Sequence, residues 1–139
     1  MNQEIKEQWV TALRSGDYRQ GSNVLHRKVD GEHQYCCLGV LCDIALKAGV
    51  DLRHNPTADC QCTTCQQEGV RMYDGYDDFL PPKVATWAGL ESINPRTTES
   101  IADPGSSIPG VTIDNATLSY LNDNGKTFSE IADIIERDF

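Results

Sequence analysis

Three cysteines within six residues form the segment of this 139-residue chain best suited to metal chemistry. They are Cys60, Cys62 and Cys65, and His54 precedes the first of them by six positions. A turn brings closely spaced thiols together, and Zn²⁺ prefers four tetrahedral ligands of the thiolate and imidazole types. The spacing predicts a structural zinc site on these four residues, with Cys42 as another candidate for the fourth ligand. Loop cysteines without a metal, or a redox pair of Cys62 and Cys65, are the alternatives.

A second pair of cysteines, Cys36 and Cys37, directly precedes an apolar run. A thiolate at a helix N-terminus is stabilised by the helix dipole and the free amides, and a cysteine-dependent hydrolase also needs a base near its thiolate. The candidate bases and orienting groups are His26, His33, Asp43 and Asp123. The other interpretation is that Cys37 is a small buried core residue, as free cysteines commonly are.

Polar and aromatic residues outside any clear periodicity are candidates for binding a ligand. Tyr18 could stack on a ring, and Arg19 and Arg27 could pair with a phosphate. Asn122 and Asp123 lie in an Asn-Asp-Asn-Gly turn, which fails as a calcium loop because the flanking ligand positions are not carboxylates. These five residues, together with the neighbourhood of Cys37, form the predicted ligand-binding set.

The charge of the chain is unevenly distributed. Residues 1–35 contain five acidic and five basic residues, residues 36–99 contain nine and five, and residues 100–139 contain seven and two, which gives the net charge of -9. No basic face is visible that could displace counterions from DNA, so direct nucleic-acid binding is not expected. The acidic C-terminal third could instead present a surface to a basic partner protein.

The sequence also lacks the features of a membrane or secreted protein. No run of 18 apolar residues is present, and residues 1–8 show no basic-then-apolar signal pattern. We therefore expect a cytoplasmic protein in a reducing compartment, with its cysteines as free thiols or metal ligands.

Helices and strands alternate irregularly along the chain. Helical periodicity or capping signals predict helices at 3–14, 36–48, 82–88, 114–121 and 128–138. Asp114 is the expected cap of the fourth helix, and Thr127 with Glu130 fits a capping box at the start of the fifth. Strand signals cover 24–28, 33–35, 70–73 and 111–113, with a long surface loop at 91–110. The Asp30-Gly31 turn predicts that the first two strands form a hairpin. Gly39 lies inside the most apolar helix, which indicates close packing there. We expect an α+β fold of four to five helices around a small antiparallel sheet, in one domain of residues 1–139 with a cysteine-containing loop insert at about 50–79.

The chain resembles a group of small, largely uncharacterised bacteriophage and prophage proteins. The matching stretches are Cys36 to Asp43 (CCLGVLCD), Trp87 to Leu90 (WAGL) and Leu121 to Glu136 (LNDNGKTFSEIADIIE), and residues 9–21 and 80–82 match as well. The cysteine-rich segment 54–65 is not a mark of the group. The resemblance implies an accessory protein that acts in the cytoplasm of the infected bacterium, where small phage proteins often counter host defence.

Our leading expectation is a non-enzymatic phage protein that sequesters a small nucleotide-like signal of host antiviral defence. Stacking would come from Tyr18, positive charge from Arg19 and Arg27, and polar groups from the Cys37 neighbourhood, Asn122 and Asp123. An acidic inhibitor that binds a host defence protein is the alternative, and a cysteine-dependent hydrolase is the third hypothesis. A homo-oligomer would be one way to build a two-sided site, although no feature of the sequence requires it.

Overall fold

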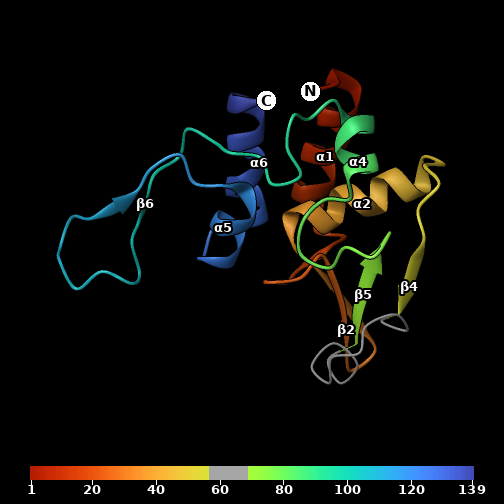
Figure 1. The fold of residues 1–139 in the computed structure, drawn as a ribbon, viewed down its shortest axis with the longest axis horizontal. Helices are drawn as coiled ribbons and strands as arrows, with labels where there is room; N and C mark the ends of the chain where they lie inside the picture. Colours follow the sequence, from red (N-terminus) through yellow and green to blue (C-terminus); the bar gives the residue numbers. More distant parts are fainter. Residues whose placement is uncertain (57–68) are drawn as a thin grey trace.

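The apolar helix α2 (Cys37–Lys47) lies at the centre of the molecule and organises its core. Eight of its eleven residues are buried. The computed structural model describes residues 1–56 and 69–139. In Figure 1, helix α1 (Gln3–Arg14) and helix α6 (Phe128–Asp138) lie side by side on one side of α2, and the main sheet lies on the other. The shorter helices α4 (Pro82–Ala88) and α5 (Leu118–Asp123) also pack against α2.

The main sheet has five strands in the order β1-β3-β2-β5-β4. Their bounds are Arg19–Gln20 (β1), His26–Val29 (β2), Glu32–Tyr35 (β3), His54–Pro56 (β4) and Val70–Tyr73 (β5). The predicted hairpin around Asp30 and Gly31 is confirmed, since β2 and β3 pair antiparallel and both turn residues have positive φ. The other contacts in the sheet are antiparallel except at β1, which runs parallel to β3. The predicted α+β class is confirmed, and the sheet is mixed because of this edge strand.

The helix ends follow the capping signals of the sequence with one exception. Thr127 and Glu130 form the predicted capping box at the start of α6. Asn2 caps α1 by accepting a hydrogen bond from the amide of Ile5. The predicted cap at Asp114 is wrong, because α5 begins at Leu118 and Thr117 accepts the hydrogen bond from Tyr120.

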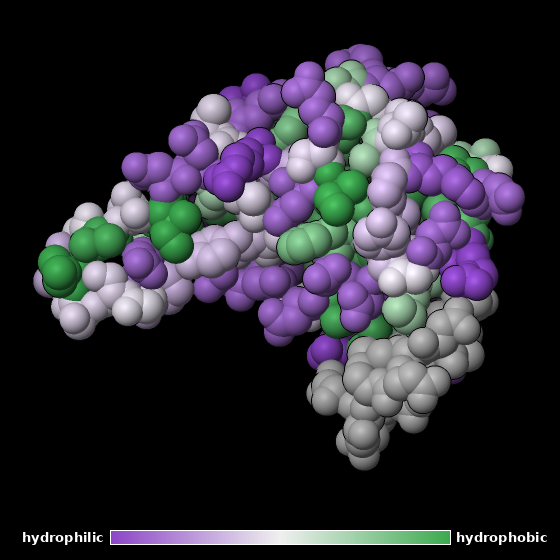
Figure 2. All heavy atoms as spheres, in the orientation of Figure 1, coloured by the Kyte–Doolittle hydropathy of each residue, from purple (hydrophilic) through white to green (hydrophobic). Residues whose placement is uncertain are grey.

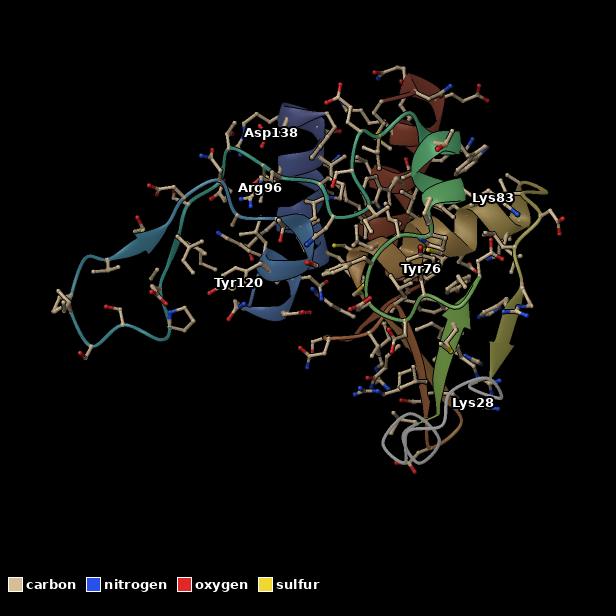
Figure 3. All side chains as sticks on the ribbon, viewed as in Figure 1. Lys28, Tyr76, Lys83, Arg96, Tyr120 and Asp138 are labelled. Atoms are coloured by element: carbon tan, nitrogen blue, oxygen red, sulfur yellow. The ribbon has the colours of Figure 1, made fainter. Side chains whose placement is uncertain are left out.

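An arm projects from the body between residues 98 and 116 (Figure 1). It contains the two short strands β6 (Ile101–Ala102) and β7 (Thr112–Ile113), so the predicted loop 91–110 includes one strand. Asp138 of α6, labelled in Figure 3, lies near the root of the arm. Its carboxylate accepts hydrogen bonds from the amide and hydroxyl groups of Thr98. Ile108 is 66% exposed, and hydrophobic residues gather at the arm's tip (Figure 2).

Among the residues that the structure describes, none of the helices has the length and apolar character needed to cross a bilayer.

Candidate functional site

A cleft of about 730 Å³ opens where β1, β3 and α2 meet. This volume lies within the range of small-molecule sites. Its lining combines two aromatic rings with charged and imidazole side chains: Asp17, Tyr18, Arg19, Glu32, His33, Tyr35, Asp43 and Lys47. These residues come from three regions of the sequence, and the parallel pairing of β1 with β3 brings the first two together. Both its size and its chemistry make this cleft the candidate ligand site.

Asp43 is the centre of a hydrogen-bond network in the cleft. Its Oδ2 accepts a hydrogen bond of 2.5 Å from the Tyr18 hydroxyl and lies 3.0 Å from Nζ of Lys47. Lys47 Nζ also donates to the Tyr18 hydroxyl oxygen at 3.3 Å. Asp43 and Lys47 are four residues apart, so they share one face of α2. Burial, and then the hydrogen bond to Asp43, raise the pKa of Tyr18, which keeps its hydroxyl protonated.

The two tyrosines form an aromatic corner beside this network. The rings of Tyr18 and Tyr35 meet edge to face with centroids 5.1 Å apart. Burial raises the pKa of Tyr35 to about 12, so its hydroxyl also stays neutral. At the opening of the cleft, exposed Arg19 forms an ion pair with exposed Glu32 on the neighbouring strand.

All three histidines of the chain lie together behind the cleft. His26 Nε2 is 2.7 Å from Nδ1 of His33, which lines the cleft, and His26 Nδ1 is 3.1 Å from Nε2 of His54. Tyr35 stacks on His26 and Tyr73 stacks on His54, each with ring centroids 4.2 Å apart. Burial lowers the pKa of His26 to about 3, so its ring is neutral and must donate at one nitrogen and accept at the other.

The family model described as "Domain of unknown function (DUF8296)" matches residues 1–139. The chain belongs to this family. Neither a curated protein nor a solved structure matched the chain. Because the family's description names no activity, the geometry of the chain's own residues carries the functional argument.

The predicted ligand-binding residues of this DUF8296 chain are divided between two pockets and the buried core. Tyr18 and Arg19 line the main cleft. Arg27, Asn122 and Asp123 line a separate pocket of about 380 Å³. Cys37 is fully buried, and its Sγ is 3.6 Å from the carbonyl oxygen of Leu118. The six residues therefore do not form one site.

Asn122 and Asp123 are occupied by contacts within the fold. Asn122 is buried, and its Oδ1 accepts hydrogen bonds from the Cys37 amide and the Gln20 side chain. Its Nδ2 donates to the Gly21 carbonyl and to Asp123. Asp123 Oδ1 also accepts from the amide of Asn23. These contacts connect β1, α2 and α5, which explains polar residues at this turn without a ligand.

The predicted ligand-binding set did not include six of the eight residues that line the cleft: Asp17, Glu32, His33, Tyr35, Asp43 and Lys47. Of these, His33 and Asp43 were predicted only as a candidate base and orienting group of a hydrolase. One signal was available, since Asp43 and Lys47 are the only charged residues in the otherwise apolar helix α2. A charged pair on a buried helix must face either solvent or a site. Tyr35 offered no comparable signal, because an aromatic residue in a strand is typical of packing.

The described cysteines have the environment of core residues. Cys36, Cys37 and Cys42 are free and buried. Burial raises the pKa of Cys37 well above its ordinary value despite its position at the first turn of α2. This opposes the reactive thiolate that a cysteine-dependent hydrolase requires.

The predicted zinc ligands are only partly within the described residues. Cys60, Cys62 and Cys65 lie outside them, whereas His54 lies in β4 with Nε2 next to His26. Residues 1–56 and 69–139 by themselves contain no group of three or more His, Cys, Asp or Glu that could hold an ion. A hydrogen bond on one imidazole nitrogen orients the ring and leaves the other nitrogen for a metal, which is the usual arrangement at ligating histidines.

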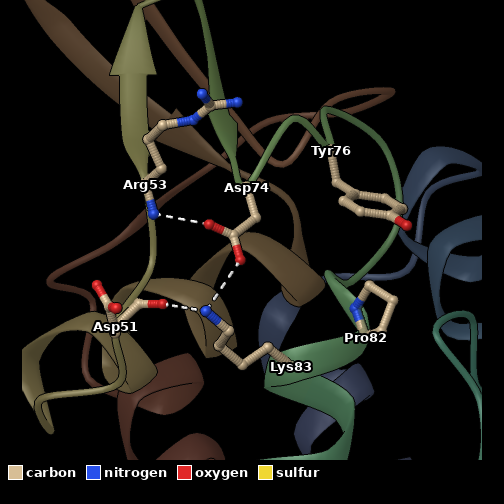
Figure 4. A pocket seen from close by; sticks show the side chains of 6 residues that line it. All are labelled: Asp51, Arg53, Asp74, Tyr76, Pro82 and Lys83. Carbon is tan, nitrogen blue, oxygen red and sulfur yellow. Dashed lines mark hydrogen bonds and ion pairs between the residues drawn. The ribbon is translucent and has the colours of Figure 1, made fainter.

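A second polar pocket, of about 530 Å³, lies between the end of α2 and the start of α4 (Figure 4). Two of its charged side chains, Lys83 and Asp74, contact each other and backbone groups of the segment after α2. Lys83 Nζ donates to the Asp51 carbonyl at 2.6 Å and lies 3.6 Å from Asp74. Asp74 also accepts from the amide of Arg53. These contacts fasten the segment after α2 to α4, so we assign this pocket a structural role.

Proposed function

We propose that this protein is a phage accessory protein that counters host antiviral defence by binding and sequestering a small nucleotide-like molecule. The observation that carries the proposal is the cleft in which Tyr18, Tyr35, Asp43, Lys47 and Arg19 converge. Aromatic rings bind a base or sugar face, a carboxylate accepts hydrogen bonds from ribose hydroxyls, and basic side chains pair with a phosphate. The phage origin and the cytoplasmic location come from the resemblance described above.

A binding role fits the cleft better than catalysis does. Asp43 is held by Tyr18 and Lys47, and the described cysteines are buried away from the cleft. The aromatic corner and the α2 face are held by the sheet and the core, so little ordering would accompany ligand binding. A preformed site of this kind suits a protein that withdraws a signal from solution by tight binding.

The test is isothermal titration calorimetry and native mass spectrometry with cyclic nucleotides and ADP-ribose derivatives. For a ligand that binds, Arg19→Gln is expected to weaken affinity by roughly tenfold, because a charge-assisted contact to phosphate is lost. Exposed Lys28 on β2 provides the control, since Lys28→Gln removes the same charge outside the cleft. Absence of binding to every compound would refute the proposal.

The alternative function, inhibition of a host defence protein, is favoured by the projecting arm. The arm exposes Ile108 and Val111. Its charged residues are all acidic: Glu99, Asp103 and Asp114. Such an arm suits insertion into an apolar crevice with a basic rim. Binding that weakens strongly with salt and does not respond to Arg19→Gln would favour this function.

A structural zinc ion bound by His54, Cys60, Cys62 and Cys65 remains part of the proposal. Three thiolates and one imidazole complete the tetrahedral set that zinc prefers. Metal analysis combined with thiol counting tests it: one zinc per chain with three thiols protected from alkylation is the expected result. Six thiols accessible in the denatured protein with no bound metal in the native protein would contradict it.

A further inference from the structure

The unused oxygen of Asp43 constrains what the cleft can bind. Its Oδ2 takes part in the contacts with Tyr18 and Lys47, whereas its Oδ1 accepts no hydrogen bond from residues 1–56 or 69–139. The Asp43 side chain is only 13% exposed, yet it lines the cleft. A carboxylate oxygen is an acceptor only, and Oδ1 is not among the buried atoms without a partner, so it is open to the cleft. The ligand group that meets Asp43 must therefore donate a hydrogen bond, as a sugar hydroxyl does and an ionised phosphate does not.

The charges of the cleft limit how many phosphates the ligand can carry. Three carboxylates, those of Asp17, Glu32 and Asp43, line it together with only two permanent cations. Both cations are already paired, Arg19 with Glu32 and Lys47 with Asp43. A triphosphate would have to separate both ion pairs while it approaches a net negative lining. A single phosphate could be accommodated at the exposed Arg19, away from Asp43.

We infer that the cleft selects a ribonucleoside with a free ribose diol and at most one phosphate, with the diol donating to Asp43. This inference rests on the proposed function and specifies its ligand class. The ring or sugar face lies against the Tyr18 and Tyr35 corner, next to the carboxylate. His33 lines the same cleft and is fixed by its 2.7 Å contact with His26, so it offers a second positioned polar group.

The experiment is a calorimetric comparison of ribonucleoside 5′-monophosphates carrying each of the four common bases with two modified forms of the tightest one. The 2′,3′-dideoxy form is expected to bind roughly ten- to hundredfold more weakly, because hydrogen bonds to a charged acceptor are lost. The triphosphate is expected to bind at least about tenfold more weakly because of the acidic lining. Equal affinity for the dideoxy form, or tighter binding of the triphosphate, would overturn the inference while leaving the proposed function in place.

Two variants separate a specific acceptor from general charge. Asp43→Asn should bring the affinity ratio of the ribo and dideoxy forms close to one. Asp17→Asn removes the same charge from the cleft and should leave that ratio unchanged, while it reduces the penalty against the triphosphate. If Asp43→Asn fails to fold, the ligand series on the unaltered protein still decides the matter. If none of the monophosphates binds, the inference is refuted, and the nucleotide-binding function is refuted with it only if the cyclic nucleotides and ADP-ribose derivatives also fail to bind.

Discussion

Gly39→Ala is expected to lower the free energy of unfolding by about 3 kcal/mol or more, although it adds only one methyl group. An alanine Cβ at this position would lie 1.7 Å from the carbonyl oxygen of Leu25 and 2.6 Å from its carbonyl carbon. Both atoms belong to the backbone, and Leu25 is fully buried. No rotamer change can relieve such an overlap, so α2 would have to move away from the segment leading into β2.

The expected loss is the opposite of what helix propensity predicts. In an unconstrained helix interior, replacing glycine with alanine is favourable by about 1 kcal/mol. At Gly39 the steric overlap outweighs that gain. The Cys36 amide also donates to the Leu25 carbonyl at 3.3 Å, so displacement of α2 would weaken this hydrogen bond as well. The same displacement would move Asp43 and Lys47, which α2 holds in the cleft.

Urea unfolding followed by circular dichroism measures the effect. Gly105→Ala is the matched control, because the atom nearest to the new Cβ would be a side-chain oxygen of Asp103 at 3.4 Å, which can move. That variant should change stability by less than about 0.5 kcal/mol. If Gly39→Ala were as stable as the unaltered protein, the close approach of α2 to Leu25 would be incorrect.

The parts of the fold that were predictable from the sequence depend on local signals. The periodicity of Ile5, Trp9 and Leu13 locates α1, the Asp30-Gly31 turn locates the hairpin, and Thr127 with Glu130 marks the start of α6. Each signal lies within about one element, so neighbouring residues determine the conformation. Gly39 in α2 was informative for the same reason. Glycine lowers helix propensity, so its presence inside a helix indicated close packing at that position.

The cleft depends on pairings between distant segments, which local signals do not determine. β1 is only two residues long and joins the sheet parallel to β3, so Tyr18 reaches Tyr35 and Asp43 only through that contact. The histidine cluster needs two more pairings between distant segments, β2 with β5 and β5 with β4, which bring His54 next to His26. The predicted set also included Asn122 and Asp123, because a polar turn has the same composition whether it binds a ligand or the protein's own backbone.

Asn122→Leu is expected to destabilise the protein by about 3 kcal/mol, since it removes the side chain that satisfies several buried groups at once. The Cys37 amide belongs to the first turn of α2, where backbone N–H groups have no partner within the helix, and Asn122 Oδ1 accepts from it at 3.1 Å. Leucine has a similar volume, so the loss would come from unsatisfied hydrogen bonds and not from a cavity. The Gln20 side-chain amide would also lose Asn122 Oδ1 as its acceptor. Gln20 in turn accepts a hydrogen bond from the Phe128 amide at the start of α6.

The same variant decides between a structural and a ligand-binding role for Asn122. Its contacts lie in a different pocket from the cleft, so the folded fraction of Asn122→Leu should bind nucleotide with an affinity close to that of the unaltered protein. Asn124→Leu is the control, because exposed Asn124 makes a single side-chain hydrogen bond within residues 1–56 and 69–139, to the Tyr120 carbonyl. Its replacement should cost about 1 kcal/mol or less. Urea unfolding gives the stability, and calorimetry at low temperature gives the affinity. A stable variant that had lost nucleotide binding would instead place the ligand beside Asn122, and the assignment of the cleft would have to be abandoned.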